Sequence, residues 1–155
     1  MTTEPTTKTK TFTVEQANSM LPLVRAIASD IAELSRDVFN RRESLEHLLA
    51  GRKLEEGDIY SDELAEVKRG LEGETERLRQ YVGELKELGV ECKGPTEGLV
   101  DFPAIRNGKL VSLCWKLDEP TVSHWHDIDS GFASRKPLDP EMLAMGSDGA
   151  ETMRR

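Results

Sequence analysis

The stretch LVDFPAIRNGKLVSLCW, residues 99–115, carries the clearest local signal in the chain. At its centre, Asn107-Gly108 is a residue pair preferred in two-residue hairpin turns, which predicts antiparallel strands over 99–106 and 109–116. Pairing across this turn sets apolar side chains opposite one another: Ala104 with Val111, Phe102 with Leu113 and Val100 with Trp115. This wholly apolar face predicts the core of a small β unit.

The second face of the same hairpin carries polar residues. It pairs Asp101 with Cys114 and Pro103 with Ser112. Because proline cannot donate to a sheet ladder, we expect its strand to be an edge strand or to be bulged there. A third short strand is predicted over residues 121–126.

Upstream of the hairpin, the apolar residues follow the period of a helix. Spacings of three and four residues predict two long helices, over 13–50 and 61–89, and the seam of the first is interrupted only by Arg41 at an inward position. The predicted fold class is therefore α+β: a long antiparallel helical hairpin followed by a small antiparallel β unit.

The ends of these helices also have sequence signals. Thr13 and Gln16 can form a capping box at the start of the first helix, and Pro22 predicts a break or kink close to that start. Ser61 is a candidate N-cap for the second helix. Gly89 is expected to end it, because glycine readily adopts the left-handed conformation that closes a helix.

Length and charge limit the classes of protein to which the chain can belong. Its 155 residues fit one domain, and its formal net charge of -8 repels phosphate, so neither nucleic acid nor a membrane surface is an expected partner. No apolar run approaches ~18 residues and no signal-peptide core is present, which predicts a cytoplasmic location. The predicted division is a disordered N-terminal arm (1–11), a single domain (12–138) made of the helical hairpin (12–89) and the β unit (90–138), and a mobile tail (139–155).

Several short motifs together resemble a known family. They are Phe12-Thr13 with Glu15, Ala17-Asn18, Leu21-Pro22, Gly98-Leu99-Val100-Asp101-Phe102-Pro103, Leu113-Cys114-Trp115, Trp125-His126, and Gly131-Phe132 with Arg135. Over about residues 12–138 the chain resembles the bacterial family called domain of unknown function 2203. The resemblance implies a helical-plus-β layout and a bacterial origin, and it brings no catalytic residues. Where this chain has His124, that family commonly has an aromatic residue.

His124 and His126 suggest a metal site. They are two residues apart, so a strand would place both imidazoles on one face, and Asp101 and Cys114 add a carboxylate and a thiol as further ligand types. The hypothesis is a divalent metal such as zinc held by His124, His126, Cys114 and Asp101. The alternative is that these are half-buried polar residues that hydrogen-bond the helix ends and the sheet rim.

The same region allows a second hypothesis, a small pocket for an anionic ligand. Arg135 would supply a bidentate fork, with His126 beside it and Trp125 and Phe132 as walls. Strand alternation puts Trp125 and His126 on opposite faces, so we expect Trp125 to be structural and His126 to be at least partly exposed. Arg135 also has three alternative carboxylate partners, Asp101, Glu119 and Asp129.

The sequence is compatible with two functions, and it is compatible with an enzyme as well as with a non-enzymatic protein. The first is a non-enzymatic interaction or scaffold module, because a two-helix hairpin leaves part of its apolar stripe uncovered. It would self-associate as a dimer in a four-helix arrangement, with a further protein partner unidentified, and its seam would be widened by Leu21, Ala28, Phe39 and Leu49. The second is a metal-binding or small-anion-binding protein, enzymatic or not, centred on the β unit.

Overall fold

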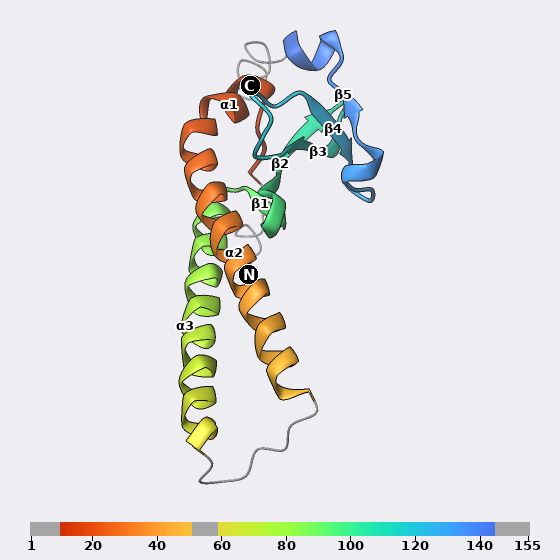
Figure 1. Ribbon diagram of the computed structural model, residues 1–155. Helices are drawn as coiled ribbons and strands as arrows, with labels where there is room; N and C mark the ends of the chain where they lie inside the picture. Colours follow the sequence, from red (N-terminus) through yellow and green to blue (C-terminus); the bar gives the residue numbers. More distant parts are fainter. Residues whose placement is uncertain (1–9, 51–58, 145–155) are drawn as a thin grey trace, which may run out of the picture.

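The computed structural model describes residues 10–50 and 59–144. A long helical hairpin extends away from an antiparallel sheet, and the N-terminal end of the hairpin packs on that sheet (Figure 1). The elements in chain order are α1 (Val14–Ser19), α2 (Leu21–Leu49), α3 (Ile59–Glu87), β1 (Glu91–Gly94), η2 (Pro95–Glu97), β2 (Leu99–Arg106), β3 (Lys109–Trp115), β4 (His124–Asp127), η3 (Phe132–Ser134) and β5 (Lys136–Pro137). The α+β fold class is confirmed.

The helix ends follow local chemistry. Thr13 and Gln16 form both hydrogen bonds of the predicted capping box. The expected break near Pro22 falls at Met20, which separates α1 from α2 and places the proline in the first turn, where its missing N–H costs nothing. After α3, Gly89 adopts φ +90° and the Val90 N–H donates to the Leu85 carbonyl at 2.9 Å, which closes the helix as predicted.

The five strands form a simple meander in the order β1-β2-β3-β4-β5. Asn107, with φ +53°, and Gly108, with φ +77°, form the predicted turn. The register between β2 and β3 is also confirmed: Val100, Phe102 and Ala104 lie opposite Trp115, Leu113 and Val111.

Pro103 lies where β2 has a strand neighbour on one side only. The pairing of β1 with β2 ends at Asp101, so the position of Pro103 is an edge position, as expected for a proline within a sheet. Beyond that point the segment before α1 lies beside β2, where the Phe12 N–H donates to the Pro103 carbonyl at 2.7 Å.

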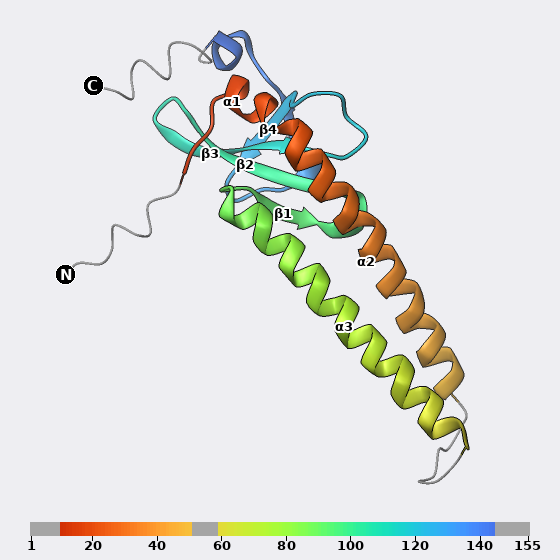
Figure 2. The same cartoon turned by 90° about the vertical axis from the view of Figure 1, so that its left-hand side faces the viewer.

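One core joins the helices to the sheet. The apolar sheet face, including the fully buried Trp115 and Phe102, packs with Leu21 and Val24 from the start of α2. Figure 2 shows α1 and the start of α2 beside the sheet. The loop between β3 and β4 is tied to the helices as well, because the Val122 N–H donates to Asn18 Oδ1 at 2.8 Å. The β unit thus packs against α1 and the first turns of α2.

Three features depart from the sequence-based expectations. Helix α3 begins at Ile59, so Ser61 lies inside it and is not its N-cap. The short strands β1 and β5 were not predicted.

The segment expected to be a mobile tail starts with a helical turn over residues 140–144. Asp139 accepts hydrogen bonds from the Met142 N–H and from Arg106, and the Met142 side chain is buried. The arm over 1–9 and the rest of the tail lie outside the described residues.

Replacing Gly73 by alanine should stabilise the protein by about 0.8 to 1 kcal/mol. Gly73 lies inside α3, where a Cβ added to its backbone would meet no atom within 4 Å, so only the helix-propensity gain remains. Thermal or urea unfolding measures the change. Gly89→Ala is the matched control and should be destabilising, because its backbone is left-handed and the added Cβ would approach Lys10 at 3.0 Å.

Candidate functional site

The sheet face opposite the core carries a group of three side chains from adjacent strands. Asp101 on β2 lies opposite Cys114 on β3, and His126 on β4 lies opposite Ser112, the next β3 residue on this face. The carboxylate and the imidazole therefore lean toward each other over β3. One ligand atom from each of Asp101, Cys114 and His126 lies within 4.8 Å of the other two. We call these three residues the polar cluster.

The polar cluster is buried. Its side chains are almost fully inaccessible, with exposed fractions of 2% for Asp101, 0% for Cys114 and 3% for His126. The expectation that His126 would be partly exposed is therefore wrong. After β4 the chain turns back, pairs with β4 as β5 and brings Arg135 beside Cys114 on this face.

His126 is held at both ring nitrogens. Its Nδ1 lies 2.8 Å from the main-chain carbonyl of Asp127, and its Nε2 lies 3.1 Å from Asp101 Oδ2. Burial raises the pKa of Asp101, and the neighbouring His126 partly offsets that rise. A carboxyl group and an imidazole therefore share this interior space without direct access to water.

The Cys114 thiol is neutral at pH 7 in this arrangement. Burial, together with the charge of Asp101, raises its pKa to about 11, while Arg135 acts in the opposite direction. Such a thiol is a poor nucleophile, because the thiolate is the reactive form. A bound cation would change this, since metal ligation displaces the thiol proton.

Glu119 fixes Arg135 beside the polar cluster. One carboxylate oxygen of Glu119 accepts from Arg135 and the other accepts from the Lys116 N–H at 3.1 Å. The Glu119 carbonyl in turn accepts from the indole N–H of Trp115 at 2.9 Å. Helix α2 supports the same loop, because Arg25 donates to the Pro120 carbonyl at 3.2 Å. Of the three carboxylates the sequence offered to Arg135, the structure uses Glu119, whose role the sequence did not single out.

The other candidate ligand residues are distributed around this group. Phe132 stacks on Arg135, with 4.1 Å between its ring centre and the guanidinium carbon. Trp125 lies on the opposite sheet face, in the core, with Arg106 over its ring. His124 shares the face of the polar cluster but lies outside it, and its Nδ1 is 3.0 Å from Ser123 Oγ. The structure thus brings together Asp101, Cys114, His126 and Arg135, with Phe132 behind Arg135.

Glu119→Gln should reduce the loss of stability in acid. Burial raises the pKa of Glu119, but its hydrogen bonds from Arg135 and from the Lys116 N–H outweigh burial and hold the pKa below its usual value. Stabilisation by the ionised carboxylate is therefore complete above the usual pKa and is lost as the pH falls through the lowered one. Urea unfolding from neutral to acid pH measures this slope. Glu87→Gln, at an exposed position, serves as the control; an equal effect there would contradict the assignment.

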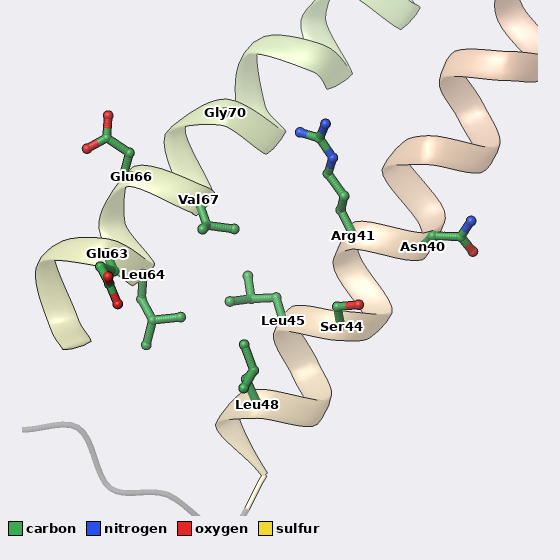
Figure 3. A pocket seen from close by; sticks show the side chains of 10 residues that line it. All are labelled: Asn40, Arg41, Ser44, Leu45, Leu48, Glu63, Leu64, Glu66, Val67 and Gly70. Atoms are coloured by element: carbon green, nitrogen blue, oxygen red, sulfur yellow. The ribbon is translucent and has the colours of Figure 1, made fainter.

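A second candidate surface lies at the far end of the hairpin. A groove of about 880 Å³ opens there between α2 and α3. In Figure 3, Leu45 and Leu48 on α2 and Leu64 and Val67 on α3 extend toward one another across an open space. The residues lining the groove are Asn40, Arg41, Ser44, Leu45, Leu48, Glu63, Leu64, Glu66, Val67 and Gly70. We call this surface the tip groove.

These features define a class of α+β protein, in which a helical hairpin extends from a five-stranded antiparallel sheet with a buried polar cluster on one face. The chain belongs to the family described as "Uncharacterized conserved protein (DUF2203)", whose family model matches residues 10–138. The resemblance seen in the sequence is confirmed. Neither the curated proteins nor the solved structures gave a match. Among the described residues, no helix is both long and apolar enough to span a membrane.

Proposed function

We propose that the protein is an interaction module in which two copies pair through their tip grooves. The observation that supports this is the change in helix packing along the hairpin. Ile27, Ile31 and Val38 of α2 are buried, whereas Leu48 and Val67, farther along the same seam, are 50% and 43% exposed. An exposed apolar groove between two otherwise packed helices is typical of a site for another helix.

Arg41 lies where the packing between the two helices loosens, although Leu71 on the tip side of this level is still buried. It occupies an inward position of the seam, and its guanidinium lies 3.1 Å from Glu74 of α3. A charged pair at this level cannot be covered by apolar side chains from the two helices alone, because both groups need water or further polar partners. Farther toward the tip the seam is apolar again, and Leu48 and Val67 are exposed along the groove that Figure 3 shows.

Charge and symmetry favour a second copy as the occupant. The α3 wall of the tip groove carries Glu63 and Glu66, and the α2 wall carries Arg41. In a twofold pair, α2 of one copy can lie along α3 of the other, so the wall with arginine meets the wall with glutamates twice. The result is a four-helix arrangement in which each hairpin fills the other's groove.

Phe39 and Leu49 remain available to widen this interface, since they are 56% and 37% exposed. Leu21 and Ala28, which the sequence suggested for the same role, are not available. Both are buried in the core of the single chain, at 3% and 1% exposure. The interface is therefore confined to the far half of the hairpin.

Light scattering and sedimentation at tens of micromolar should give the mass of a dimer. Leu48→Asp should weaken pairing by at least about tenfold, because it places a charge in the apolar groove. Leu23→Asp is the matched control: Leu23 is an equally exposed leucine of the same helix, at 51%, outside the tip groove. A strictly monomeric parent protein, or dissociation by Leu23→Asp and not by Leu48→Asp, would overturn the proposal.

A further inference from the structure

We propose that Asp101, Cys114 and His126 bind one divalent transition-metal ion of the zinc class. The ligand atoms of these residues lie within 4.8 Å of one another, and all three side chains are buried. They come from three adjacent strands of one sheet, which is a rigid support for a metal site. This inference does not depend on pairing through the tip groove.

The hydrogen bonds of His126 leave two electron-rich atoms, His126 Nε2 and Asp101 Oδ2, facing each other. The Asp127 carbonyl, 2.8 Å from Nδ1, can only accept, so Nδ1 carries a hydrogen. In a neutral imidazole Nε2 then bears a lone pair, and this lone pair faces Asp101 Oδ2 at 3.1 Å. A proton or a metal ion must lie between these two electron-rich atoms. Metal-bound histidines commonly donate their other N–H to a main-chain carbonyl, as His126 does.

The distances are close to those of a tetrahedral site. With Zn–N and Zn–O bonds near 2.1 Å and a Zn–S bond near 2.3 Å, ligand atoms lie roughly 3.3 to 3.7 Å apart. The 3.1 Å between His126 Nε2 and Asp101 Oδ2 is already near this range. The spread of 4.8 Å that includes the Cys114 sulfur requires a shift of about 1 Å, which a side-chain rotation can supply.

Asp101 has one oxygen that the described residues leave without a partner. Its Oδ1 is buried and has no hydrogen-bond partner of normal geometry in residues 10–50 and 59–144, and the Cys114 thiol is the other side chain besides His126 that interacts with this carboxyl group by hydrogen bonding. Leaving such a group unsatisfied costs about 1 to 3 kcal/mol. Coordination of a cation would offset part of this cost, since the carboxylate would then lie against a positive charge.

The ligand types and the charge select the kind of metal. Mixed nitrogen, sulfur and oxygen ligands suit zinc or cobalt, whereas magnesium and calcium require oxygen ligands. A thiolate and a carboxylate would give the site a charge of -2, which matches a divalent ion. Arg135 lies beside Cys114 but is already neutralised by Glu119, so it does not repel the cation as an isolated charge would.

Metal binding is tested with tag-free protein refolded from urea under reducing conditions with Co²⁺ alone or Zn²⁺ alone, which allows the ion to enter a buried site. We expect one equivalent per chain by elemental analysis after desalting. The Co²⁺ form should show a thiolate-to-cobalt charge-transfer band, because Cys114 would be a ligand. Since loss of an outer-shell partner alone costs 10- to 100-fold in affinity, Cys114→Ser should weaken Co²⁺ binding by at least about 100-fold.

Matched controls separate ligation from folding. Cys92→Ser removes the other cysteine and His124→Ala removes a histidine outside the polar cluster, and both should keep the full band. Far-ultraviolet circular dichroism and melting of each metal-free variant check that it folds. The proposal is overturned if folded parent protein binds no stoichiometric metal and gives no charge-transfer band. It is also overturned if the band survives Cys114→Ser and is lost with Cys92→Ser.

Discussion

Replacing Trp115 by alanine is expected to lower the free energy of unfolding by about 3 to 5 kcal/mol. Trp115 is fully buried, and it is the largest side chain where the sheet meets the start of α2. Its indole N–H also holds the Glu119 carbonyl, so the variant loses a hydrogen bond as well as a large apolar surface. Urea and thermal unfolding measure the change.

Exposure provides the control for this prediction. Ile128 is 51% exposed, so Ile128→Ala should change stability by no more than about 0.5 kcal/mol. The loss of stability in Trp115→Phe should lie between those of Ile128→Ala and Trp115→Ala, because phenylalanine keeps much of the ring volume but loses the hydrogen bond. A melting temperature of Trp115→Ala equal to that of the parent would mean that Trp115 does not occupy the core.

Asp101→Ala should destabilise metal-free protein by about 1 to 3 kcal/mol, the cost of leaving a buried hydrogen-bonding group without its partner. Asp101 and His126 are hydrogen-bonding neighbours and both are buried, so removing Asp101 leaves His126 Nε2 without its partner. The measurement is a double-mutant cycle in urea with Asp101→Ala, His126→Ala and the double variant. We expect the double variant to be more stable than the sum of the single changes predicts, by about 1 to 3 kcal/mol. Strict additivity would contradict a direct interaction between the two side chains.

The parts of the fold that depend on neighbouring residues could be predicted from the sequence. The turn at Asn107-Gly108 determines the register of its two strands, and therefore places Asp101 opposite Cys114. The capping box at Thr13 and the closing glycine at Gly89 were predictable for the same reason, since each is satisfied within a few residues of backbone. The start of α3 was predicted less well, because Ser61 was expected to be the N-cap and lies inside the helix.

The depth of the polar cluster could not be predicted in this way. Strand alternation shows which face His126 occupies, but not what covers that face. After β4 the chain returns as a two-residue strand, β5, too short to give a sequence pattern of its own, and this return brings Arg135 beside Cys114. The choice of Glu119 by Arg135 likewise depends on how the loop after Trp115 is held by Arg25, which lies 94 positions before Glu119 in the chain. Local sequence carries no signal for such a contact.

The extension of the hairpin beyond the sheet also affects how the protein behaves in solution. Helix α2 has 29 residues, so its rod is about 44 Å long, and only its first part lies against the β unit. A molecule of this shape has more friction with water than a sphere of the same mass and tumbles anisotropically. A single copy should therefore elute from a sizing column ahead of globular standards of its 17.4 kDa mass. Elution volume alone would then report a dimer for either state, whereas scattered light or sedimentation equilibrium separates one chain from two.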